Sequence, residues 1–227
     1  MEKTMEVQKP TGSTISRVLT RIGGVLLAPE STYQQVIANK ISFWEPLIVV
    51  LLLVGVQTAI IASFCYRVIA AIEESLTSIT GAIPLGLFSF FAAIVFMGAI
   101  LVTLAMWVLL ALIAHIIARH VFKGQGSFGQ LMKLYGYSTI PCSLQILGLT
   151  LFGINWVLWP ILVFFHVVAL FWIVILMSIA VKQNYNIDAG KAFIASFVGP
   201  MTVWLIITGV LWAWVWFTIS SFTGGFI

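Results

Sequence analysis

The side chains of this sequence that could do chemistry are few, and they are polar groups set within or beside long apolar runs. Gln57 and His166 each lie inside such a run, and His115, Arg119 and His120 lie together at the end of another. Polar groups inside a membrane cost free energy to bury and often mark functional sites. Three uses can be weighed: a metal centre, a contact with anions or lipid headgroups, and hydrogen bonds between helices.

A metal centre is the use that the spacing argues against. A rise of 1.5 Å per helical residue places His115 about 5 Å, and His166 about 22 Å, from the inner ends of their helices. The two imidazoles therefore cannot share an ion, and no Cys, Asp or Glu joins either one in its apolar run. The sequence also lacks a Gly-rich phosphate loop, a His-Glu-x-x-His pair and a Gly-x-Ser-x-Gly elbow. We expect no metal, no cofactor and no enzymatic activity.

The basic residues near the apolar runs predict a contact with lipid headgroups or another anion at the cytosolic rim. His115 and Arg119 are four residues apart and share one helix face, at a carboxyl-terminal end where cations complement the helix dipole. His120 follows directly. Arg17 and Arg21 lie opposite the apolar stripe of an amphipathic helix that is expected in the membrane interface. Two structural alternatives stay open: snorkelling at the interface, and a helix packed on the bundle with solvated arginines.

Gln57 and His166 lie deeper in the expected membrane. Helix rise places them about 16 Å and about 22 Å from the cytosolic edge. One hypothesis is a hydrogen bond between the first and fourth spans, of the kind that is worth roughly 0.6–2 kcal/mol in membranes. The rival hypothesis is that they form the polar lining of a permeation path.

The overall composition sets the class of protein. Of the 227 residues, 61% are hydrophobic and only 8% are charged, and the mean hydropathy is +1.12. A soluble domain carries about 25% charged residues, so this chain cannot cover a water-exposed surface. The isoelectric point near 9.2 reflects dispersed basic residues, which topology and anionic lipids explain. We therefore expect an integral membrane protein without a nucleic-acid partner.

The hydrophobic pattern predicts an all-α polytopic bundle of five transmembrane helices, with cytosolic interfacial amphipathic helices. Residues 1–13 are expected to form a disordered tail, 14–45 amphipathic helices, and 46–227 the membrane domain. A further amphipathic segment, 127–138, is capped by Ser127 and is expected to lie flat on the inner leaflet. The expected spans are about 46–66, 91–118, 141–156, 158–181 and 189–219, the fourth following the third as a tight hairpin and the last bent at Gly199-Pro200.

Charge predicts how this bundle is oriented. With the amino terminus in the cytosol, ten basic residues fall on the inner side and only Arg67 falls outside. This asymmetry follows the positive-inside rule. We therefore expect the amino terminus in the cytosol and the carboxyl terminus outside the membrane.

Several short motifs, taken in order, resemble the Yip-domain family of polytopic membrane proteins, which is named for interaction with Ypt/Rab GTPases. They include Ala28-Pro29-Glu30-x-x-Tyr33-x-x-Val36 before the first span, Ser127-Phe128 leading through Tyr135-Gly136-Tyr137-Ser138 to Pro141, and Asp188 with Lys191-Ala192 opening the last helix. The resemblance implies a five-helix membrane domain with a cytosolic amino terminus. Eukaryotic members are linked to Rab binding and vesicle trafficking. This chain has only about 45 residues before its first span, so we do not extend GTPase binding from the family to it. Its compact form is similar to the prokaryotic branch, and this resemblance implies a prokaryotic cell membrane.

These observations predict a non-catalytic membrane scaffold or adaptor. It would contact lipids and a membrane or cytosolic protein partner at the cytosolic face, in membrane organisation or trafficking. The alternative is a small transporter or channel subunit with a polar path near Gln57 and His166. Gly55, Ala59 and Ser63 recur every four residues on the first span and form a small-residue face, which could serve internal packing or a homo-oligomer seam.

Overall fold

The computed structural model describes residues 14–39, 41–80 and 85–223, and this part of the chain is built of helices and their connections. The predictions for residues 1–13 lie outside it. The elements are α1 (Thr14–Leu27), α2 (Pro29–Ala38), α3 (Trp44–Thr80), α4 (Leu85–Ile116), η1 (Ile117–Val121), α5 (Phe128–Ser138), α6 (Cys142–Ile154), η2 (Trp156–Leu158), α7 (Trp159–Tyr185), α8 (Ala189–Phe193), η3 (Ile194–Val198) and α9 (Gly199–Thr223).

The described residues contain five helical segments that are long and apolar enough to cross a membrane. They are Trp44–Ala70, Phe96–Val121, Phe128–Ile154, Trp156–Tyr185 and Ala189–Thr218. Large apolar side chains along these helices are widely exposed, as expected where lipid replaces water as the solvent. The predicted all-α, five-span fold is confirmed, and the chain is a multi-pass integral membrane protein.

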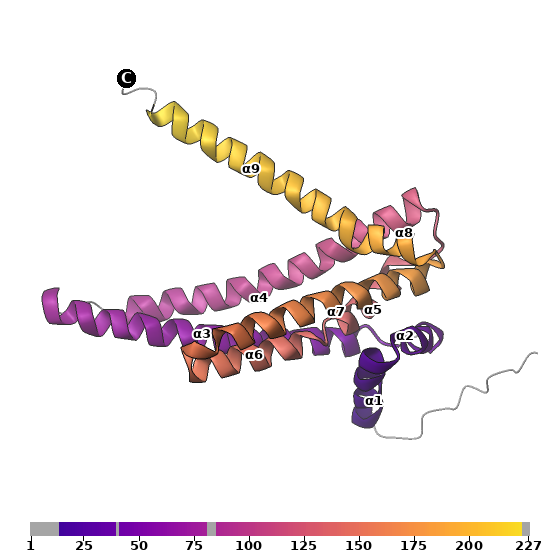
Figure 1. The fold of residues 1–227 in the computed structure, drawn as a ribbon, viewed down its shortest axis with the longest axis horizontal. Coiled ribbons are helices and arrows are strands. Elements are labelled where there is room, and N and C mark those ends of the chain that lie inside the picture. Colours follow the sequence, from indigo (N-terminus) through magenta and orange to yellow (C-terminus); the bar gives the residue numbers. More distant parts are fainter. Residues whose placement is uncertain (1–13, 40, 81–84, 224–227) are drawn as a thin grey trace, which may run out of the picture.

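The spans run alongside one another, except for the last (Figure 1). Helices α6 and α7 form the predicted antiparallel hairpin, in which the Asn155 side chain accepts a hydrogen bond of 3.0 Å from the Val157 amide and closes the turn. Helix α9 leaves the bundle at an angle to α7, and only the first part of α9 contacts α4. Helices α1 and α2 gather at the end of the bundle where α3 and α5 begin and α4 and α7 end.

Helix α5 corrects one expectation of the sequence. The amphipathic segment 127–138 does not lie flat on a surface; it packs against α3, α4 and α7, and Leu131, Leu134, Tyr135 and Tyr137 are fully buried. Its apolar stripe faces neighbouring helices instead of lipid. With α6 it makes the apolar segment Phe128–Ile154, which begins before the predicted span start at 141.

Two other boundaries also differ from the expected ones. Helix α3 itself continues to Thr80, beyond the predicted span of about 46–66, and its 37 residues correspond to about 55 Å at 1.5 Å per residue. That length exceeds the ~30 Å hydrocarbon layer, so α3 extends beyond it. A bend was predicted at Gly199-Pro200, and the helix is irregular just before this pair, in the π-helical turn η3. A proline cannot donate the helical hydrogen bond and clashes with the carbonyl four residues earlier, which a π turn relieves.

Candidate functional site

The Ser127–Ser138 segment is held in place first by its own cap. The Ser127 side chain accepts a hydrogen bond of 3.3 Å from the backbone N–H of Gln130, so α5 begins at Phe128 as the sequence predicts. The last turn of α5 is Tyr135-Gly136-Tyr137-Ser138, and all four residues are buried. Each of the last three contacts a different part of the amino-terminal region, as the next paragraphs describe.

Gly136 lets α5 approach the start of α3. A Cβ atom placed on Gly136 would lie 2.7 Å from the Pro46 Cβ and 3.2 Å from the Pro46 carbonyl oxygen. The first distance is shorter than real Cβ atoms show and the second is unusually tight, and a proline ring has little freedom to move aside. Glycine is therefore required where these two helices meet.

Tyr137 completes a polar cluster with Glu45 and Arg21. The Tyr137 hydroxyl donates a hydrogen bond of 2.5 Å to Glu45 Oε1. Arg21 Nη1 lies 2.5 Å from the same oxygen and 2.7 Å from Glu45 Oε2. The Arg21 and Glu45 side chains are only 17% and 19% exposed. Burial by itself lowers the pKa of the Arg21 guanidinium, but the hydrogen bond and charge of Glu45 outweigh burial and raise it, so Arg21 stays a cation. The cluster joins α1, α3 and α5.

Ser138 joins α5 to α2. Its hydroxyl donates to the Leu134 carbonyl at 3.0 Å, so the Tyr33 hydroxyl, 2.8 Å from Ser138 Oγ, is the donor in the second bond. Tyr33 is fully buried, and burial raises the pKa of its phenol well above the ordinary value. We call Arg21, Tyr33, Glu45, Tyr137 and Ser138 the junction, because they tie the two amino-terminal helices to the membrane bundle.

Three further contacts surround the junction. Lys133 Nζ donates to the Ile41 carbonyl at 2.6 Å. On the exposed side of α2, Glu30 forms an ion pair with Lys182 of α7 at 2.7 Å, and Gln34 donates to Gln183 at 3.1 Å. Exposed pairs of this kind contribute little stability each, but they fix which face of α2 meets α7.

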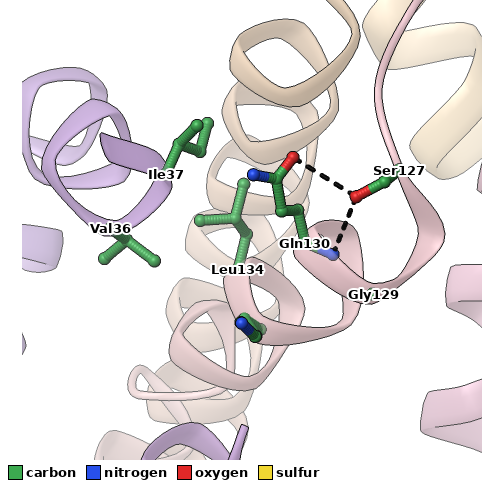
Figure 2. A pocket seen from close by; sticks show the side chains of 7 residues that line it. Val36, Ile37, Ser127, Gly129, Gln130 and Leu134 are labelled. Carbon is green, nitrogen blue, oxygen red and sulfur yellow. Dashed lines mark hydrogen bonds between the residues drawn. The ribbon is translucent and has the colours of Figure 1, made fainter. Parts of the chain in front are cut away.

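Beside the junction, α2 and α5 enclose a surface groove of about 430 Å³. Figure 2 shows Gln130 and Leu134 of α5 facing Val36 and Ile37 of α2, with the Ser127–Gln130 hydrogen bonds at one end. The lining of the groove is mixed, with apolar residues such as Leu134 and polar residues such as Gln130 and Lys133.

The residues predicted to contact headgroups have different surroundings. The Arg21 guanidinium is paired with Glu45 within the junction, and its side chain is only 17% exposed. The His115 ring is hydrogen-bonded to the Tyr185 hydroxyl and packs edge-on to Phe128, so it joins α4 to α7 and α5. Arg17, Arg119 and His120 lie at the surface. For these three the headgroup contact stays a prediction.

The hydrogen bond predicted between Gln57 and His166 is not formed. Gln57 Nε2 donates instead to Gln145 Oε1 of α6 at 3.3 Å, and the His166 ring is 3.1 Å from the Leu162 carbonyl of its own helix. Helix α6 contacts both α3 and α7, and this arrangement supplies Gln57 with a different partner. The prediction of an interhelical polar contact is therefore right for Gln57 and wrong for the partner.

Two further expectations can be compared with the described residues. No cluster of three or more His, Cys, Asp or Glu side chains that could hold a metal ion occurs among them. On the small-residue face of α3, Ala59 and Ser63 are exposed, and a Cβ on Gly55 would meet no atom within 4 Å. Among the described residues, no side chain packs closely on Gly55 of this face.

The comparisons with known proteins settle the family. A model of the Yip1 domain matches residues 23–213, which is most of the chain and contains all five spans except the last few residues of the fifth. The chain belongs to the Yip1 domain family. No curated protein and no solved structure gives a significant match. The resemblance seen in the sequence is thus confirmed.

The Yip1 domain match begins inside α1 and ends inside α9, so it includes every junction residue except Arg21. Within this Yip1-domain chain, the Tyr135-Gly136-Tyr137-Ser138 motif is the segment on which α2 and α3 converge. Sequence reasoning missed Glu45 as the centre of the junction. The available signal was a carboxylate at the edge of an apolar span, which requires a cationic or hydrogen-bonding partner.

Proposed function

We propose that this Yip1-domain protein is a non-catalytic membrane scaffold or adaptor. The surface formed by α1, α2 and the start of α5 contacts lipid headgroups and a partner protein at the cytosolic face of the membrane. The positive-inside charge distribution supports placing this surface in the cytosol.

The observation that carries this proposal is the construction of the junction. Two amphipathic helices that could have lain free in the interface are fixed to the bundle by buried hydrogen bonds and an ion pair. Fixing them presents a defined surface, with a groove of about 430 Å³ between α2 and α5. A preorganised surface loses less conformational entropy on binding a partner, which suits an adaptor.

Site-specific photocrosslinking in native membranes tests this proposal. A photoreactive residue at Ile37 or Gly129 would report on the groove, and one at Trp156 would report on the opposite end of the bundle. We expect a discrete protein adduct from the groove positions, weakened by Glu45→Gln, and none from Trp156. Equal labelling at both ends, or labelling by lipid alone at the groove, would contradict the adaptor proposal.

A small transporter or channel subunit is the second candidate, and one observation favours it. Gln57 lines an intramembrane cavity of about 650 Å³ between α3, α4, α6 and α7. His166, the other residue of the expected polar path, does not line this cavity. Solute flux into proteoliposomes that Gln57→Leu abolishes would support transport over scaffolding.

A further inference from the structure

The intramembrane cavity carries an inference of its own. Its walls come from four helices, and along α3 its lining runs from Val50 to Ile69, about 28 Å at 1.5 Å per residue. The hydrocarbon layer is ~30 Å thick, so the cavity extends over most of the membrane's apolar depth. It shares no lining residue with the groove at the junction.

The size and lining of the cavity resemble those of a ligand site. Its volume of about 650 Å³ lies within the range of roughly 300–1,000 Å³ that is typical of small-molecule pockets, which are mostly apolar with a few placed polar groups. Most of the lining side chains are aliphatic or aromatic, and none is charged. A charged headgroup would find no counter-ion here, so the chemistry favours a neutral, mainly hydrocarbon molecule.

Two polar side chains in this lining, Gln145 and Trp107, have N–H donors without an acceptor within the described part of the chain. Gln145 is only 7% exposed, and its one hydrogen bond among the described residues is the bond that its Oε1 accepts from Gln57. The Nε2 amide group of Gln145 is therefore left with two N–H donors and no acceptor. Trp107 lines the same cavity, is 6% exposed, and its indole N–H has no partner in the described structure either. The Trp107 N–H is itself buried, and buried donors are normally paired, so an unpaired donor in this wall points to an acceptor from outside the chain.

We propose that this cavity binds one neutral lipid, whose hydrocarbon chain lies along α3 and whose carbonyl oxygen accepts a hydrogen bond from Gln145 Nε2. The shared chemistry is a long apolar chain with an uncharged carbonyl group. An isoprenoid quinone and a diacylglycerol both have it. The depth of Gln145, about 14 Å from the end of α6 by helix rise, requires that the carbonyl reach the middle of the membrane.

Binding to the full chain in phosphatidylcholine nanodiscs tests this inference. Decylubiquinone and dioleoylglycerol are the two probes, and intact-complex mass spectrometry counts the molecules bound. We expect one molecule of at least one probe per chain. A Gln57→Leu/Gln145→Leu double variant should bind it three- to tenfold more weakly, because it loses the amide donors. Replacing both members of the pair leaves no unpaired amide, so the variant should still fold, which its thermal midpoint checks.

Two matched variants complete the experiment. Thr150→Val changes an exposed polar residue on α6 outside the cavity and should leave binding unchanged. Ala62→Phe places a ring inside the cavity and should abolish binding of both probes. Competition between the two probes shows whether the site prefers the quinone or the diacylglycerol, and a preference for either one supports a neutral-lipid site. Binding of neither probe, or binding that the double variant and Ala62→Phe leave unchanged, would overturn it.

Discussion

At the scale of single residues, the junction depends on a glycine and on an ion pair. Gly136 is required because α5 and α3 approach one another most closely there, and Glu45 is required because it pairs Arg21 and accepts from Tyr137. Both lie in the region matched by the Yip1 domain. Each gives a prediction with a control on the same chain.

Gly136→Ala should destabilise the protein by about 1–3 kcal/mol, the usual cost of forcing extra volume into a packed contact. The new methyl group would press on Pro46. The control is Gly129→Ala on the same helix, where an added Cβ meets no atom within 4 Å, and this variant should be neutral or slightly stabilising. Thermal unfolding in detergent micelles measures both. Equal midpoints for the two variants would show that the α3–α5 contact is looser than described.

Glu45→Gln keeps the shape of the side chain but leaves Arg21 in a largely buried position without its counter-charge. Losing hydrogen bonds to a charged group costs about 1.5–3 kcal/mol, and we expect a loss of this order in the stability of the docked α1. A double-mutant cycle with Arg21→Met isolates the pair, because the double variant should lose less than the sum of the single variants. Hydrogen exchange of α1 amides is the readout. Strict additivity would mean that the two side chains do not interact.

At the scale of elements, the sequence predicted much of the helical pattern. Hydropathy and length predicted five spans, and Ser127 caps its helix as expected. The role of α5 could not be predicted, because an apolar stripe that faces lipid and one that faces other helices have the same periodicity. The partner of Gln57 was missed for a related reason. Helix rise gives the depth of a residue in the membrane, but the sequence does not give the order of helices around the bundle.

The Asp188 cap of α8 gives a pH prediction. The backbone N–H of Lys191, followed by its side chain, stabilises the Asp188 carboxylate and lowers its pKa below the ordinary value. A lowered pKa in the folded state means that the cap contributes fully above the ordinary Asp pKa and is lost as pH falls through the lowered value. The Lys191 backbone amide should therefore exchange more slowly at pH 7 than an equally exposed amide without a hydrogen bond. This protection should fall in acid. Asp188→Asn should keep the protection with no pH dependence, and Asp188→Ala should lose it at every pH. An equal pH response in the Asn variant would contradict the cap.

At the scale of the whole molecule, this five-span protein has most of its buried tyrosines at one end, and the Gln57–Gln145 contact lies within the spans. Of the chain's five tyrosines, four are buried at that end among the described residues, and lipid-facing apolar side chains fill the remaining length. The orientation follows from charge and not from packing, so it is a separate prediction.

An odd number of spans places the two chain ends on opposite sides of the membrane. Reporter fusions at each end should show the amino terminus in the cytosol and the carboxyl terminus outside. Both reporters on one side would mean that one of the five apolar helices does not cross.

The central claim is that α1 and α2 are fixed parts of the bundle, and zero-length crosslinking in native membranes tests it most directly. A carbodiimide joins a carboxylate to an amine only where the two already form a close pair. Glu30 of α2 and Lys182 of α7 are 2.7 Å apart, and the local pair Asp188–Lys191, 3.0 Å apart, is an internal positive control. The account predicts a linked Glu30–Lys182 peptide in the mass spectrum, absent in Glu30→Gln and reduced in Glu45→Gln. A linked Asp188–Lys191 peptide without any Glu30–Lys182 link would show that α2 is not docked on α7, and would contradict the claim.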